Sequence, residues 1–148
     1  MTRRQQREGK AGQNVAAVML TAIGIERVRQ IGTPVRLVDS TITSKGIYFK
    51  VVWGEQVAGD HTGIAPGGIF VLAETKTHDG TTLPWSVFRD HQPGELSDHA
   101  LCGGISLVVW VCGQDIFILR WPVPGFGPGK SIPIDYARQA NITTVRDL

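Results

Sequence analysis

The run from Ile69 to Lys76 constrains the fold of this chain more than any other segment, because it starts as an apolar strand and ends in two charges. Five apolar residues, as in a strand covered on both faces, precede the triplet Glu74-Thr75-Lys76. Side chains alternate between the two faces of a strand, so we expect Glu74 and Lys76 to project together. A Glu-x-Lys pair is also common on solvated edge strands. The apolar residues before it favour a buried central strand, where such a pair needs a functional reason.

Asp60 lies 14 positions before Glu74, in a turn-rich stretch over residues 59–68. We expect this turn to bring Asp60 to Glu74 and Lys76. Two carboxylates, together with the backbone carbonyl of Thr75, would bind a hard divalent cation, Mg²⁺ or Mn²⁺. Such a metal activates water and stabilises the charge that builds on a scissile phosphate, and Lys76 adds a positive charge beside it. The pattern therefore predicts metal-dependent phosphodiester hydrolysis.

The other hydrophobic patterns predict an α/β domain. Apolar residues at helical spacing indicate helices, and runs rich in β-branched and aromatic residues indicate strands. The predicted elements are a helix over 11–29, strands over 34–39, 46–53 and 69–76, a helix over 90–101, a hairpin of strands 105–112 and 115–121, and a short helix over 133–141. We therefore expect a mixed sheet flanked by helices, with the domain over residues 11–121 and residues 122–148 packed on it as a Pro- and Gly-rich loop and a short helix.

Basic residues are concentrated near the N-terminus. Residues 1–36 hold seven basic and two acidic side chains, whereas the rest of the chain holds eight and eleven. We expect residues 1–10 to form a flexible basic arm that binds nucleic-acid phosphates, and a solvated N-terminus without a ligand is the simpler alternative. The candidate phosphate contacts in this arm are Arg3, Arg4, Arg7 and Lys10.

Several other classes of protein are disfavoured by the sequence. No apolar run reaches the roughly 18 residues that a membrane span needs, and no apolar signal core follows the basic N-terminus, so we expect a cytoplasmic protein. Cys102 and Cys112 form no CxxC pair, which favours buried, reduced thiols. The four histidines lack the spacing of zinc ligands.

A set of short motifs follows in a fixed order along the chain. They are Thr33-Pro34-Val35, Tyr48-Phe49, Asp60-His61-Thr62-Gly63, Glu74-Thr75-Lys76, Leu83-Pro84-Trp85, His91-Gln92 and Gly103-Gly104. In order and spacing this set resembles the RecU-type Holliday-junction resolvases, nucleases of the PD-(D/E)xK superfamily with the restriction-endonuclease-like fold. The resemblance covers roughly residues 9–121.

The resemblance implies a role for each residue of the predicted site. Asp60, Glu74 and the carbonyl of Thr75 would bind the metal. Lys76 would be the catalytic lysine, and Gln92 would help to place the water or a phosphate from the start of a helix. The resemblance also implies a homodimer that binds four-way DNA junctions and nicks two strands symmetrically, in recombination or repair.

The chain departs from this family at two places. The family's first helix carries an acid shortly after a glycine, whereas the segment Gly12-Gln13-Asn14-Val15-Ala16 has none. The family also has a protruding stalk before the aspartate, which inserts into the junction. We expect a short stalk here, with room only in residues 50–59.

Two alternatives for the function stay open at this point: a nuclease of the same fold with nicking or restriction-type specificity, and a non-catalytic DNA-binding protein that keeps the fold. Two further residues are candidate DNA contacts. His61 is either a phosphate contact or an ordinary turn residue, and Trp53 either stacks on DNA bases or lies in the core. Trp110 and Trp121, in apolar strands, are expected in the core.

Overall fold

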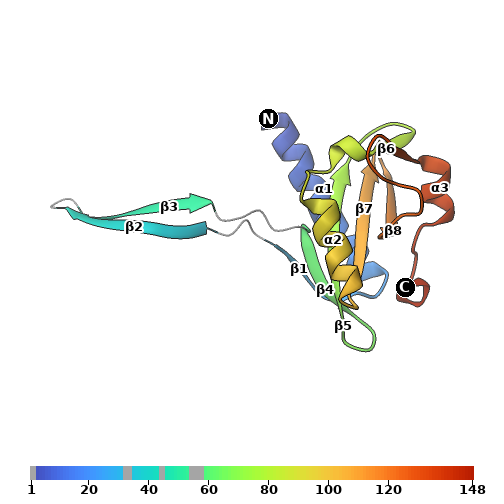
Figure 1. Ribbon diagram of the computed structural model, residues 1–148, viewed down its shortest axis with the longest axis horizontal. Helices are drawn as coiled ribbons and strands as arrows, with labels where there is room; N and C mark the ends of the chain where they lie inside the picture. Colours follow the sequence, from blue (N-terminus) through green and yellow to red (C-terminus); the bar gives the residue numbers. More distant parts are fainter. Residues whose placement is uncertain (1–2, 32–34, 44–45, 54–58) are drawn as a thin grey trace.

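The computed structural model describes residues 3–31, 35–43, 46–53 and 59–148, with side chains for residues 9–31 and 59–148. Its centre is a mixed five-stranded sheet in the order β1-β4-β5-β7-β8 (Figure 1). Strands β5 and β7 are parallel neighbours, and the other pairs are antiparallel. The strands of this sheet are β1 (Glu26–Gln30), β4 (His61–Ala65), β5 (Ile69–Thr77), β7 (Ile105–Cys112) and β8 (Asp115–Arg120).

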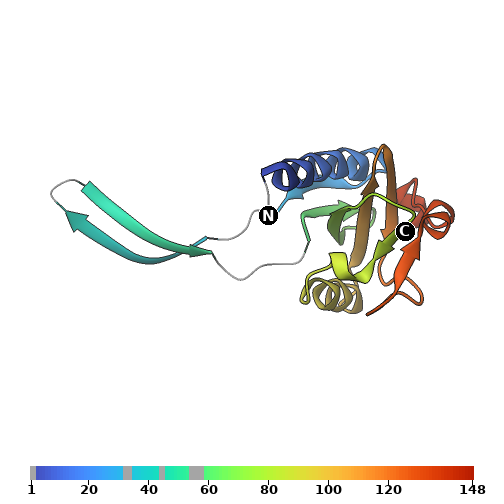
Figure 2. The ribbon, with the colours of Figure 1, turned by 90° about the horizontal axis from the view of Figure 1, so that it is seen from above.

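Two helices, α1 (Arg3–Ala22) and α2 (Gln92–Leu101), cover opposite faces of this sheet, as Figure 2 shows. The side chains of β5 alternate between these two layers. Ala73 is buried in one cluster with Leu20 of α1, whereas Leu72 is buried in a second cluster with Leu96 of α2. The predicted α/β architecture, a mixed sheet flanked by helices, is confirmed, and β5 is its buried central strand.

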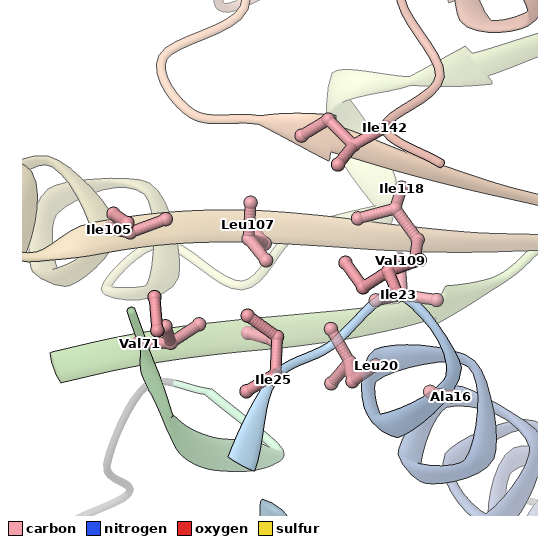
Figure 3. Close-up of a cluster of buried hydrophobic side chains, with 12 residues drawn as sticks. Ala16, Leu20, Ile23, Ile25, Val71, Ile105, Leu107, Val109, Ile118 and Ile142 are labelled. Atoms are coloured by element: carbon pink, nitrogen blue, oxygen red, sulfur yellow. The ribbon is translucent and has the colours of Figure 1, made fainter. Parts of the chain in front are cut away.

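The core beneath α1 is made of aliphatic side chains from helix and sheet (Figure 3). Leu20, in the last turn of the helix, and Ile23, just after its end, are buried in one cluster with Leu107 and Val109 of β7 (Figure 3). Burial of each such side chain contributes about 1.5–3 kcal/mol, so this layer fixes where α1 lies on the sheet.

Helix α1 ends at Ala22, whereas the sequence predicted that it would continue to residue 29. Gly24 has a φ of +108°, and its N–H donates to the carbonyl of Thr21, while the N–H of Ile25 donates to the carbonyl of Leu20. These two bonds form a Schellman cap that closes the helix at a glycine. Residues 26–30 then form β1, an edge strand. Its side chains are mostly exposed, so neither face of the strand needs apolar residues. The sequence therefore lacks the alternation that would have predicted a strand.

The start of α1 also differs from the prediction. The helix begins at Arg3, so Arg4, Arg7 and Lys10 belong to its first turns and not to a flexible arm. The predicted arm is therefore wrong for residues 3–10. Lys10 is exposed on the helix, while the side chains of the three arginines fall outside the described residues.

Residues 61–65, where we expected only turns, form strand β4 between β1 and β5. His61, Gly63 and Ala65 are buried on one face of this strand. Gly63 is required there, because a Cβ atom on it would lie 2.4 Å from Cγ2 of Ile25. The glycines that suggested a turn are thus explained in part by close packing.

A hairpin of two strands, β2 (Val35–Thr43) and β3 (Gly46–Trp53), follows β1. It forms an antiparallel sheet of its own and extends away from the five-stranded sheet (Figures 1 and 2). Both strands were predicted, although β2 is longer than expected. The expectation that only residues 50–59 have room for a short stalk is wrong, since the projecting hairpin already starts at Val35.

The C-terminal residues pack on the domain, as expected. Val123, Ile132, Ala137 and Ile142 are buried in the two core clusters. Cys102 is exposed and Cys112 is partly exposed, so the expectation of buried thiols is wrong. In the described part of the chain, no helix combines the length and the apolar character needed to cross a membrane. The remaining elements are β6 (Thr82–Pro84), η1 (Trp85–Val87), β9 (Ser131–Pro133), α3 (Ile134–Gln139) and η2 (Val145–Asp147), with β6 paired to β9.

Candidate active site

The end of β5 brings Glu74 and Lys76 together on the α2 face of the sheet, as the alternation predicted. Nζ of Lys76 donates to Oε1 of Glu74 over 2.7 Å. Glu74 is only 2% exposed, so this ion pair lies inside the protein. Lys76 also lies over the ring of Phe88, with Nζ 4.9 Å from the ring centroid. The ring and the carboxylate together fix the position of the lysine.

Gln92, the first residue of α2, connects the two charged side chains. Its Nε2 donates to Oε1 of Glu74, and its Oε1 accepts from Nζ of Lys76 over 2.6 Å. The same Oε1 accepts from the N–H of Arg89. Gln92 therefore lies at the start of a helix beside the site, as the resemblance implied. Its amide holds Glu74 and Lys76 in place.

Asp60 reaches the site from the residue just before β4. Its N–H donates to the carbonyl of Ala73, and its carbonyl accepts from the N–H of Ile31, both over 2.8 Å. Its carboxylate is held at both oxygens. Oδ2 accepts from the N–H of Thr75 and Oδ1 accepts from Nε2 of Gln13, again over 2.8 Å each. The predicted meeting of Asp60 with the end of β5 is thus present in the structure.

The buried position of Glu74 disfavours the ionised form of its carboxyl group. Burial raises the pKa of its carboxyl above the ordinary value, and the negative charge of Asp60 raises that pKa further. The charge of Lys76 and a hydrogen bond from the N–H of Gly59 act in the opposite direction. Two carboxylates that interact in a buried place favour a bound cation between them.

The backbone N–H and carbonyl of Thr75 face Asp60. Its N–H donates to Asp60, and the N–H and carbonyl of one strand residue point to the same side of the strand. The carbonyl of Thr75 is therefore on the side of Asp60. This orientation is the one that the predicted third ligand requires.

The donor set at this site fits a magnesium-like ion. Among the described residues, no group of three or more His, Cys, Asp or Glu side chains is placed to hold a metal. Mg²⁺, however, commonly takes one or two carboxylates and completes its shell with water and substrate phosphates. Asp60 and Glu74, with the carbonyl of Thr75, match that pattern. An ionised carboxylate has about four acceptor positions, and the hydrogen bonds to Asp60 leave some of them open.

Helix α1 approaches β5 closely at Gly12. A Cβ atom on this residue would lie 2.3 Å from Oγ1 of Thr77, and Ala16, one turn later, is completely buried. The helix backbone thus lies against the strand, and this contact brings Gln13 to Asp60. Gln13 in turn accepts a hydrogen bond from Nε2 of Gln30 over 2.6 Å.

Gln13 and Gln30 were not identified from the sequence. Both are uncharged, and they are separated by a helix end and a turn. The segment around Gly12 was notable only because it lacks an acid, and the amide of Gln13 is what the structure places near the site. The position of Gln13 next to the close-packed glycine was the one signal available.

Two other candidates fall elsewhere. His61 is 1% exposed, so the prediction that it contacts DNA phosphates is wrong for this structure. Its burial also lowers the pKa of the imidazole. Trp53 ends β3, and its side chain lies outside the described residues. Trp110 and Trp121 are buried, which confirms their expected place in the core.

Comparison with known proteins supports the fold. No protein-family model and no curated protein sequence matches the chain. Among solved structures, the chain is similar to Hjc of Archaeoglobus fulgidus, a Holliday junction resolvase from an archaeal hyperthermophile. The TM-score is 0.60 at 12% sequence identity, and the match covers 95% of this chain and all of the other. The chain therefore has the restriction-endonuclease-like fold that this resolvase has.

Proposed function

We propose that this protein is a metal-dependent DNA endonuclease that hydrolyses phosphodiester bonds of branched DNA, in the manner of a RecU-type resolvase. One observation carries the proposal. Asp60, Glu74 and Lys76 meet at the end of one buried strand, in a fold shared with a Holliday junction resolvase. Buried charges of this kind are costly for a domain that needs them only for stability.

Each residue has a defined part in this chemistry. Asp60, Glu74 and the carbonyl of Thr75 would hold Mg²⁺ or Mn²⁺, which when bound supplies an activated water and neutralises charge on the phosphate. Lys76 has three N–H donors, of which Glu74 and Gln92 take two. The third is available in this arrangement to donate to a phosphate oxygen or to the attacking water.

The projecting hairpin supports branched DNA as the substrate. It lies between β1 and Asp60 in the chain, so the residues after the hairpin lead directly to the first residue of the site. The resemblance places a junction-inserting stalk in this part of the chain. We assign that part to β2 and β3, with DNA held in addition by the basic first turns of α1.

A homodimer is part of the proposal. Resolving a four-way junction requires two matched cuts, and a twofold dimer supplies two identical sites. The described residues of one chain carry a single cluster of Asp60, Glu74 and Lys76. Light scattering at micromolar concentration, with and without junction DNA, distinguishes a dimer from the 16.1 kDa monomer.

The direct test is cleavage of end-labelled four-way junction, duplex and single-stranded DNA, with Mg²⁺ and with a chelator. We expect metal-dependent cleavage of the junction and loss of cleavage in Asp60→Asn. Asp115→Asn is the matched control, because Asp115 lies exposed at the start of β8. Preferred cleavage of duplex DNA would favour a nicking or restriction-type enzyme. Binding without any cleavage would favour a non-catalytic DNA-binding protein.

A further inference from the structure

We infer that Gln13 is a positioning residue for Asp60, held in one orientation by Gln30, and that this pair of amides sets how well the site binds a divalent cation. The inference rests on the proposed function, because it assigns Asp60 to the metal. The three side chains are hydrogen-bonded in series: Gln30 on the edge strand β1 contacts Gln13 on helix α1, and Gln13 contacts Asp60 just before β4.

Asp60 determines which way the hydrogen bonds between these side chains run. An ionised carboxylate only accepts hydrogen bonds, so Gln13 must turn its Nε2 to Oδ1 of Asp60. Its Oε1 then points away from Asp60 and needs a donor. Nε2 of Gln30 supplies that donor over 2.6 Å. The two amides are thus oriented in series, and each fixes the direction of the next.

The effect on Asp60 is to fix its plane. Thr75, on β5, holds Oδ2 through a backbone N–H, while Gln13 holds Oδ1 from α1. Without Gln13 the carboxylate keeps one fixed oxygen and can rotate about it. A metal ligand that is free to rotate binds with a larger loss of entropy, which is why partners of metal ligands affect affinity.

The placement of Gln13 depends on features already described. Gly12 allows α1 to lie against β5, and β1 is hydrogen-bonded to β4, with Gln30 opposite His61. Gln30 therefore lies one strand away from the residue that follows Asp60. Gln30 is exposed, so its contact with Gln13 adds nothing evident to the core. A role in orienting the site accounts for the pair.

A first experiment needs no metal. In the metal-free protein, ¹H–¹⁵N spectra should show the Gln13 side-chain amide as a dispersed pair of resonances. These should move to positions typical of solvated amides in Asp60→Ala, and part of the way toward them in Gln30→Leu, where the bond to Asp60 remains. Resonances of Gln13 that are already typical of a solvated amide in the wild type would overturn the inference.

A second experiment titrates the protein with Mn²⁺ alone, following free Mn²⁺ by electron paramagnetic resonance. We expect about tenfold weaker binding in Gln13→Ala, the low end of the range for partners of metal ligands. Gln30→Leu should give a smaller loss, and the double variant should bind no more weakly than Gln13→Ala, because Gln30 acts through Gln13. Gln114→Ala, in the exposed turn between β7 and β8, is the matched control.

The outcomes separate the two proposals. Wild-type protein that binds no Mn²⁺ would overturn the metal-dependent function and with it the role of the amide pair. Wild-type binding with unchanged affinity in Gln13→Ala would overturn the amide pair alone. If the losses of Mn²⁺ affinity in Gln13→Ala and Gln30→Leu added up in the double variant, the role of the amide pair would likewise be overturned. If Gln13→Ala fails to fold in circular dichroism, the exposed Gln30→Leu variant decides the question by itself.

Discussion

Nζ of Lys76 lies 2.7 Å from Oε1 of Glu74, and the two side chains are 11% and 3% exposed. Such a pair is costly to break from one side, because the remaining charge keeps its desolvation penalty without its partner. The pair is therefore both the centre of the proposed chemistry and a point on which folding depends.

Lys76→Met should abolish cleavage and lower the free energy of unfolding by about 3 kcal/mol at neutral pH. Glu74→Gln in the same protein should recover much of that stability without restoring cleavage, since no buried charge is left unpaired. Urea denaturation and the junction assay measure the two effects. If Lys76→Met alone were as stable as the wild type, the ion pair of Lys76 and Glu74 would be better solvated than the structure indicates.

His61 predicts a dependence of stability on pH. Burial lowers the pKa of the folded-state imidazole below 6.5. As the pH falls through that ordinary value, the unfolded chain gains a proton before the folded one does, so the wild type loses stability on the acid side. Above the ordinary value both states are neutral, and this contribution is fully present.

His61→Phe should remove that loss. Nδ1 of His61 is buried without a hydrogen-bond partner in the structure, so an aromatic ring that lacks this nitrogen removes an unpaired buried polar atom. The difference in unfolding free energy between variant and wild type should shift in favour of the variant from about pH 7.5 to about pH 5.5. Glu74 titrates in both proteins and cancels in this difference. A difference that does not change with pH would contradict the prediction.

Gly12→Ala should push α1 away from β5, because the new Cβ atom would lie 2.3 Å from Oγ1 of Thr77. We expect a loss of about 1–3 kcal/mol in stability and weaker Mn²⁺ binding as Gln13 moves away from Asp60. Gly9→Ala is the control on the same helix. A Cβ atom on Gly9 would have no other atom within 4 Å, and helix propensity predicts a gain of about 1 kcal/mol.

Replacing the β2–β3 hairpin by a short Gly-Ser linker should remove the preference for junctions and keep metal-dependent cleavage of simpler DNA. The five-stranded sheet does not include either strand, so the domain should still fold. Competition binding with junction and duplex DNA measures the preference. An unchanged preference for junctions would assign substrate choice to the body of the domain.

Removal of positive charge at the start of α1 should act on binding and not on chemistry. Arg3, Arg4 and Arg7 lie within the first turns of the helix. Replacing all three with alanine should lower affinity for every DNA tested. The slope of log K against log salt should become shallower by about 0.9 for each phosphate that an arginine neutralises in the wild type. An unchanged slope would mean that this end of the helix is only solvated.

The parts of the site that the sequence predicted are those that follow from local alternation. Glu74 and Lys76 share a face because they are two residues apart in one strand, and no tertiary information is needed for that. The burial of β5 on both faces was likewise indicated by its apolar run. Asp60 was predicted from its distance along the chain and is held to β5 by the N–H of Thr75.

The parts that were missed depend on tertiary contacts. Gln13 reaches Asp60 because α1 touches β5 at a glycine, and Gln30 reaches Gln13 because β1 lies beside β4. The edge strand β1 has no apolar alternation, so its residues were assigned to the preceding helix. His61 was assigned to a turn because the glycines around it suggested one, whereas Gly63 is needed for close packing against Ile25.

The hairpin leaves the sheet after Ile31 and returns at Asp60, and these two residues are joined by a backbone hydrogen bond of 2.8 Å. The hairpin is thus an insertion whose two ends are tied together by a backbone hydrogen bond at a proposed metal ligand. Neither β2 nor β3 pairs with the five-stranded sheet, so this closing bond, and not the hairpin, belongs to the sheet that carries the site.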